Sequence, residues 1–131
     1  MKSILISIRP KWVAKILKRE KTIEIRKTAP KCDLLIDVYI YCTNGDYIGH
    51  LSKRYVGKVV AKFTLRKVEP VFRLDLYDKS CLSPAEIFRY ANGRRVYAWH
   101  ISDLVIFDKP KELGEFGLEK APQSWCYVEE K

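Results

Sequence analysis

One short segment of the sequence concentrates side chains that could do chemistry: Lys21-Thr22-Ile23-Glu24-Ile25-Arg26. Polar and apolar residues alternate along it, as they do in a half-buried β-strand. Alternation places Thr22, Glu24 and Arg26 on one face, with successive side chains about 7 Å apart. Ile23 and Ile25 then face the core. The segment therefore predicts a hydroxyl, a carboxylate and a guanidinium in a row, with a lysine at the start of the strand.

Each of these groups suits recognition of a nucleic acid. Arg26 could place its forked N–H groups on a phosphate or a base edge. Glu24 could accept a hydrogen bond from the exocyclic amine of cytosine or adenine. Lys21 offers a positive charge for phosphate, or a reactive amine if burial favoured its neutral form. The alternative is an exposed strand face with a Glu24–Arg26 ion pair worth less than about 1 kcal/mol.

Positive charge is concentrated in the same part of the chain. Residues 1–31 contain ten Lys or Arg and two Glu, for a net charge of +8, whereas residues 32–131 contain fifteen Lys or Arg and fourteen Asp or Glu, for a net charge of +1. A concentrated excess indicates a positive face for a polyanion. The alternative is a basic surface that only aids solubility.

The elements around the motif follow from periodicity. Residues 4–8 predict a first strand, and Pro10 suits the first turn of a helix, where its missing N–H costs nothing. Three apolar residues of that helix face the core: Val13, Ile16 and Leu17. Lys11, Lys15 and Lys18 lie at i, i+4 and i+7 and therefore line one exposed edge. The helix thus brings a row of lysines beside Lys21.

The rest of the chain predicts mostly strands. A second helix is indicated by Ser83-Pro84-Ala85-Glu86, a capping box with proline at the first position, and it ends at Asn92-Gly93. The remaining strands are expected over residues 37–42, 58–71, 95–101 continued after a kink by 104–107, and 122–128. At 131 residues, one domain over residues 1–131 is expected. Five or six strands and two short helices predict an α+β, mostly β fold, either a small mixed β-barrel or a strongly curled sheet.

Two further residues are candidates for the binding face. An exposed Trp12 could stack on a base, although packing in the core is the commoner fate of tryptophan and is the expectation for Trp99 and Trp125. His100 could hydrogen-bond a base or a catalytic group, or be a half-buried structural histidine. Arg9 precedes the lysine-rich helix and joins the expected basic face.

The sequence gives no sign of a metal or cofactor. Its four cysteines are widely separated, and neither histidine has a cysteine or histidine neighbour at ligand spacing, so we expect no metal site. No nucleotide-binding glycine loop or paired-histidine motif is present. The short apolar N-terminus ends in Arg9-Pro10 and is neither an export signal nor a membrane span. We therefore expect a cytoplasmic protein with reduced thiols.

The motif and its surroundings resemble the ASCH family of PUA-like proteins. That family is marked by a Gly, a Lys two residues on, a Glu three after that and an Arg two further, following a first strand and helix. Lys21, Glu24 and Arg26 match, and Arg19 stands at the glycine position. Two more segments are similar to small ASCH proteins of bacteria and phages: Ser7-Ile8-Arg9-Pro10 and Pro122-Gln123-Ser124-Trp125.

This resemblance implies a PUA-like β-barrel with the motif on the floor of a cleft between the first helix and the barrel. It also implies binding of RNA or modified nucleotides. Some similar proteins are amidohydrolases that deacetylate N4-acetylcytidine, with the motif Lys, a Thr at the position of Glu24, and a later Glu just before the second helix. Here the later stretch is Asp78-Lys79-Ser80-Cys81, so two of three catalytic positions depart.

Three functions are consistent with the sequence. The first is a binding module for RNA or a modified nucleotide that uses a basic cleft. The second is a nucleotide-directed hydrolase, an N4-acetylcytidine amidohydrolase or a ribonuclease, in which Lys21, Thr22 and Glu24 cooperate. The third is a protein-interaction domain, supported only by the acidic segment from Glu112 to Glu130.

Overall fold

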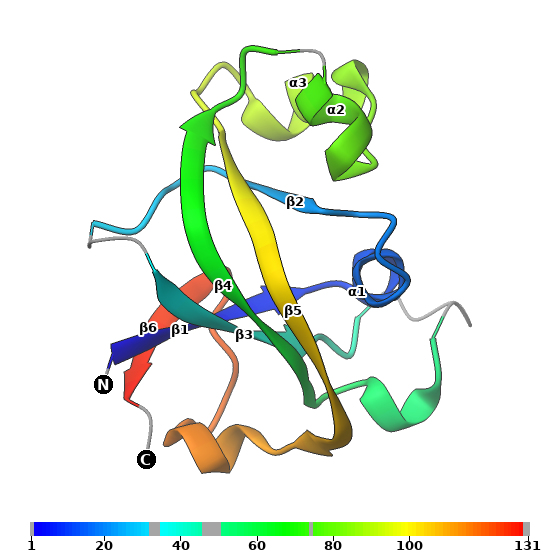
Figure 1. Ribbon diagram of the computed structural model, residues 1–131, viewed down its shortest axis with the longest axis vertical. Coiled ribbons are helices and arrows are strands. Elements are labelled where there is room, and N and C mark those ends of the chain that lie inside the picture. Colours follow the sequence, from blue (N-terminus) through cyan, green and yellow to red (C-terminus); the bar gives the residue numbers. More distant parts are fainter. Residues whose placement is uncertain (1, 32–34, 46–50, 74, 130–131) are drawn as a thin grey trace.

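The computed structural model describes residues 2–31, 35–45, 51–73 and 75–129. Its strands are β1 (Lys2–Ile8), β2 (Ile23–Arg26), β3 (Ile36–Cys42), β4 (Val59–Pro70), β5 (Tyr97–Lys111) and β6 (Trp125–Glu129). They form one sheet in the order β2-β5-β4-β3-β1-β6, in which β1 and β3 are parallel and the other pairs antiparallel. The sheet curls into a half-barrel (Figure 1), which confirms the expected mostly β, α+β fold.

Three α-helices accompany the strands in the described residues, where the sequence predicted two. Helix α1 (Pro10–Leu17) begins at the expected Pro10, helix α3 (Pro84–Ala91) begins and ends as expected, and the Ser83–Glu86 capping box is formed. The additional helix is α2 (Asp75–Ser80). Its six residues contain one buried apolar side chain, Leu76, so they are too few to show helical periodicity. The described residues also contain two short 3₁₀ turns, Lys53–Tyr55 and Leu113–Phe116.

The bend in the sheet comes from β4 and β5, which run side by side along the molecule (Figure 1). Their pairing shifts register at several points, and Asp103 adopts a left-handed backbone conformation with φ 52°. This is the kink expected between residues 101 and 104. Bulges of this kind increase twist and curl a sheet, so the two long strands can wrap around the core.

Among the described residues, buried apolar side chains form three clusters. The first fills the half-barrel beneath α1 and includes Ile4, Val13, Ile16, Phe63 and Trp99. The second joins β2 to α2 and α3 through Ile23, Ile25, Leu76 and Ile87. The third covers the other side of the sheet and includes Leu5, Tyr39 and Tyr41, with Phe107 and Phe116 packed against it. Helices α2 and α3 therefore cover one face of β2, and the half-barrel interior covers the other.

This packing confirms that Ile23 and Ile25 are buried, and it argues against the alternative of an exposed polar face on β2. Glu24 is 6% exposed. It is the cross-strand partner of the fully buried Trp99, so it points into the half-barrel rather than into solvent. Alternation predicted which side chains share a face, but it carries no information about what covers that face.

In the described residues no helix is long and apolar enough to cross a membrane.

Candidate nucleic-acid interface

A tight turn connects α1 to the motif strand. Arg19 has φ 63°, in the left-handed region. Its N–H donates to Ile16 O at 2.9 Å, and the N–H of Glu20 donates to Lys15 O at 3.0 Å. These two bonds form a Schellman motif, which ends a helix and reverses the chain. The turn places Lys21 at the start of β2, beneath α1.

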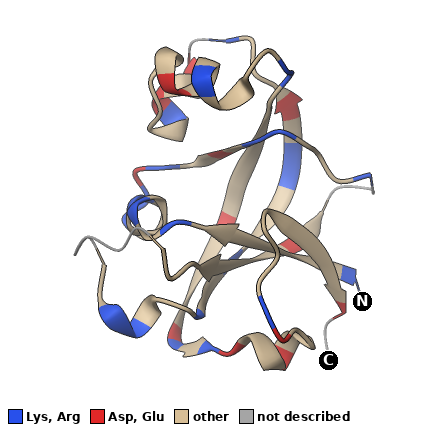
Figure 2. Cartoon of the chain, turned by 180° about the vertical axis from the view of Figure 1, so that it is seen from behind, with Lys and Arg blue, Asp and Glu red and all other residues tan. Residues whose placement is uncertain are grey.

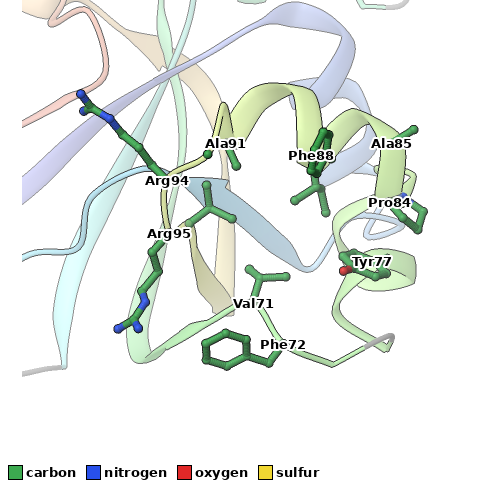
Figure 3. Close-up of a pocket in the computed structure, with 12 residues that line it drawn as sticks. Val71, Phe72, Tyr77, Pro84, Ala85, Phe88, Ala91, Arg94 and Arg95 are labelled. Carbon is green, nitrogen blue, oxygen red and sulfur yellow. The ribbon is translucent and has the colours of Figure 1, made fainter.

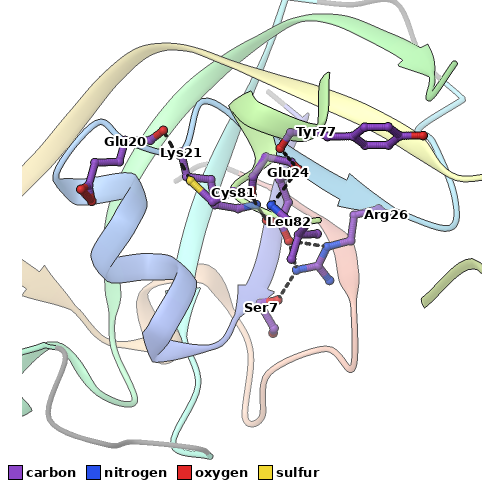
Figure 4. Close-up of polar contacts among 9 residues, drawn as sticks. Ser7, Glu20, Lys21, Glu24, Arg26, Tyr77, Cys81 and Leu82 are labelled. Carbon is purple, nitrogen blue, oxygen red and sulfur yellow. Dashed lines mark hydrogen bonds and ion pairs between the residues drawn. The ribbon is translucent and has the colours of Figure 1, made fainter. Parts of the chain in front are cut away.

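Lys21 and Glu24 meet in a buried cluster (Figure 4). Lys21 is 2% exposed, and its Nζ donates to the carbonyl of Ser80 at 2.5 Å. The same Nζ lies 3.4 Å from Glu24 Oε1. Ser80 ends α2, so the motif is bound to the helix that sequence reasoning missed. Lys21 and Glu24 therefore form a buried charged pair.

Arg26 completes the cluster and also links distant strands. Its Nε and Nη2 donate to Glu24 Oε2 at 2.9 and 2.7 Å. Nη2 also donates to Ser7 O at 2.7 Å, and Nη1 donates to Ser124 Oγ at 3.1 Å. β2 and β6 are the two edges of the sheet. Arg26 therefore ties one edge strand to β1 and to the residue that precedes the other edge, and its forked donors are used inside the protein rather than held out to a phosphate.

The charges of this cluster keep Glu24 ionised. Burial alone would raise the pKa of Glu24, but the positive charges of Arg26 and Lys21 and their hydrogen bonds outweigh burial and hold that pKa below its ordinary value of 4.5. Two cations around one buried carboxylate leave the cluster with a net charge of +1. It is therefore a fixed positive centre beneath α1.

Helix α1 carries an aromatic ring that lies close to two ammonium groups. Trp12 is partly buried, and its ring lies 4.7 Å from Lys11 Nζ and 5.2 Å from Lys21 Nζ. Lys11 and Lys18 are exposed, as is Arg9 in front of the helix, whereas Lys15 is half-buried. Figure 2 shows Lys and Arg along α1 and the turn that follows it. The structure thus joins the basic helix edge to the buried motif through Trp12.

Helix α3 lies on the other side of the motif. The ring of Tyr90 lies 4.9 Å from Lys27 Nζ, and burial raises the pKa of its phenol. Lys11 of α1 in turn acts on Glu86 of α3. Tyr90 and Glu86 were not among the predicted site residues. No local sequence signal identifies them, because their link to β2 depends on how α3 packs.

Two predicted site residues lie apart from the cluster. Thr22 is exposed and contributes main-chain bonds, from its N–H to Lys79 O and from Ile101 N–H to its carbonyl. His100 is the cross-strand partner of Ile23, so it points to the opposite side of β2 from Glu24. There its Nε2 lies 2.6 Å from Glu69 Oε2. The structural interpretation of His100 is therefore the better one.

The other tryptophans support the same region from below. Trp99 is fully buried and donates to Thr28 O, and Trp125 donates to Thr28 Oγ1. The described cysteines, Cys42, Cys81 and Cys126, form no disulfide; Cys32 lies outside the described residues. Within the described ranges, no group of three or more His, Cys, Asp and Glu side chains is arranged to hold a metal ion.

Comparison with known proteins identifies the architecture. No family model and no curated protein matches the sequence. Among solved structures, the ASCH protein from Zymomonas mobilis superimposes with a TM-score of 0.74 at 20% identity, over 97% of this chain and 87% of that one. A single-residue variant of the same protein gives 0.75 at 20% identity, over 98% and 91%. The chain has the ASCH fold.

The fold brings together the two segments that flank the motif, Ser7-Ile8-Arg9-Pro10 and Pro122-Gln123-Ser124-Trp125. Ser7 and Ser124 are 117 residues apart in the sequence, yet Ser7 N–H donates to Ser124 O at 2.9 Å and Ser7 Oγ to Pro122 O at 2.7 Å. Both segments hold Arg26. The turn at Arg19 also explains the glycine of the ASCH hallmark, because glycine adopts positive φ without steric cost. Arg19 adopts the same conformation here at a cost of about 1–2 kcal/mol.

Proposed function

We propose that this protein binds RNA or a modified nucleotide at the face of α1, over the Lys21–Glu24–Arg26 cluster. One observation supports the proposal: the Trp12 ring lies close to an exposed ammonium, that of Lys11 at 4.7 Å, and to a buried one, that of Lys21 at 5.2 Å. A base stacked on an indole gains about 1–3 kcal/mol. Nearby positive charges suit the phosphates on either side of that base. No other described tryptophan lies beside two lysines.

The residues divide into three roles. Arg9, Lys11, Lys15 and Lys18 contact the phosphate backbone, and Trp12 stacks on a base. Glu24 is enclosed, so its role is to hold Lys21 in place beneath the ring. Arg26 supports Glu24 from behind, since its donors already bind Glu24, Ser7 and Ser124.

The same geometry favours binding over hydrolysis. Lys21 is engaged as a cation by Glu24 and by the carbonyl of Ser80. Thr22, which the enzyme hypothesis needs beside them, is exposed and held through its main chain. A carboxylate at position 24 would also repel the oxyanion that forms during deacylation. We therefore expect purified protein to turn over no N4-acetylcytidine. Clear turnover that Lys21→Ala abolishes would put the enzyme function first.

A salt titration tests the proposal. Affinity for a single-stranded RNA is expected to fall steeply with added salt, with a slope of about −0.7 in log–log form for each phosphate contacted. Changing Lys11, Lys15 and Lys18 together to Glu should weaken binding and make the slope shallower by about 2. The matched control changes Lys53, Lys109 and Lys120 to Glu, which alters the net charge equally at exposed sites away from α1. Equal losses in the two triple variants would reduce the effect to net charge and overturn the proposal.

A further inference from the structure

A second concave surface lies at the α2–α3 end of the molecule. A groove of about 690 Å³ runs between the segment after β4, helices α2 and α3, and the segment before β5 (Figure 3). Its lining is mainly apolar and includes Val71, Phe72, Tyr77, Ile87, Phe88 and Val96. A volume of this size is in the range of ligand-binding clefts. Nothing in the proposed α1 interface uses it.

Two phenylalanines in this groove are unusually exposed. Phe72 is 75% exposed and Phe88 is 79% exposed. They come from different segments, and Figure 3 shows the side chain of Val71 between them. Exposed large apolar side chains that gather in one concavity mark a binding surface, whereas single scattered ones do not. The two phenylalanine rings therefore suit a binding partner with flat apolar groups.

The charges of the groove specify that partner further. The charged residues that line it are Arg94 and Arg95, and both are exposed. The Arg95 guanidinium lies 5.9 Å from the centroid of the Phe72 ring. A second aromatic–cation pair follows on α3, where Lys27 Nζ lies 4.9 Å from the Tyr90 ring. Aromatic faces alternating with cations suit bases alternating with phosphates. A net charge of +9 argues against a second copy of this chain.

Helix α3 connects this groove to the motif. Phe88 lines the groove, and the ring of Tyr90, two residues further on, lies 4.9 Å from Nζ of Lys27, the residue that follows the strand carrying Glu24 and Arg26. We infer that the groove binds unpaired bases of a single-stranded nucleic acid, whose chain continues across α3 to the α1 interface. This inference rests on the proposed function. It adds a requirement for single strands, because bases in a duplex cannot reach the two rings.

The test uses two double variants of the whole chain. Phe72→Ala with Phe88→Ala removes both rings, and Phe72→Leu with Phe88→Leu keeps apolar bulk but removes the stacking faces. Since both rings are largely exposed, the fold is expected to persist in either variant. The matched control is Val105→Ala with Ile106→Ala, which trims exposed apolar side chains on β5. Affinity is measured for a fluorescein-labelled single-stranded oligoadenylate of about twelve nucleotides and for an RNA hairpin of matched length.

We expect both phenylalanine variants to bind the single strand at least about tenfold more weakly. The control should match the unsubstituted protein, and the hairpin should bind all of them equally. If the single strand binds the unsubstituted protein and the phenylalanine variants alike, while the α1 triple variant loses it, the groove inference fails and the proposed function stands. If the unsubstituted protein binds no RNA, both fail. Amide shifts at the groove caused by an acidic leucine-rich peptide, and not by oligoadenylate, would assign the groove to a protein partner and overturn the inference.

Discussion

Replacing Glu24 by Gln should reveal how strongly the buried motif depends on its charges. Glu24 lies 3.4 Å from Lys21 Nζ and 2.7 Å from Arg26 Nη2. The side chains of these two cations are only 1% and 11% exposed, so water cannot replace the lost carboxylate. Removing one partner of a buried ion pair costs about 3–5 kcal/mol. For 131 residues, the unfolding entropy is about 0.28 kcal/mol/K near 60 °C, so Tm should fall by about 11–18 °C.

The pH dependence of this loss gives a second check. Because the pKa of Glu24 in the folded state lies below 4.5, the ion pairs contribute fully above about pH 4.5 and are lost as pH falls through the folded-state value. The difference in stability between the unsubstituted protein and Glu24→Gln should therefore be full at pH 7 and shrink progressively below pH 4.5. Urea unfolding followed by tryptophan fluorescence measures it. The exposed Glu119→Gln serves as control, with an expected change within about 0.5 kcal/mol. A loss below about 1 kcal/mol for Glu24→Gln, or one that is independent of pH, would refute the reasoning.

Three further predictions concern single residues. Arg19→Gly should stabilise the protein by about 0.5–1 kcal/mol in a urea titration, because φ 63° strains arginine but not glycine. The control is Lys18→Gly, which lies at φ −83° and should give no gain in stability. Arg26→Lys should lower the free energy of unfolding by about 2 kcal/mol, because lysine cannot reproduce the forked bonds to Glu24, Ser7 and Ser124. Amide hydrogen exchange should also accelerate along β6. Unchanged exchange there would contradict the link between the edge strands. Burial raises the pKa of the Cys42 thiol to about 11, so roughly one molecule in a thousand carries its thiolate at pH 8. Iodoacetamide should therefore label the partly exposed Cys81 well before Cys42. The reverse order of labelling, followed by mass spectrometry, would be inconsistent with this burial.

Local sequence patterns predicted much of the fold. Pro10 and the Ser83–Glu86 capping box predicted the helix starts, and alternation predicted that Ile23 and Ile25 are buried. These signals depend on neighbouring residues alone, which is why they can be read from sequence. Helix α2 was missed because six residues cannot display a helical period.

The environment of the site could not be predicted in the same way. Arg26 bonds to Ser7 and Ser124, which are 19 and 98 residues away along the chain. Glu24 was expected on the floor of a cleft, but its degree of burial follows from the curl of the sheet and from Trp99, which enclose it. His100 was considered for the site, but its position in the β2–β5 register turns it to the opposite face. Each of these outcomes is decided by tertiary packing, which a strand pattern does not encode.

The most direct test of the central claim is a crystal structure of the protein soaked with a short single-stranded RNA. The account predicts density for a base against the Trp12 ring, with its phosphates beside Lys11 and Lys18. RNA density confined to other faces, with Trp12 and the lysines of α1 left uncovered, would contradict it.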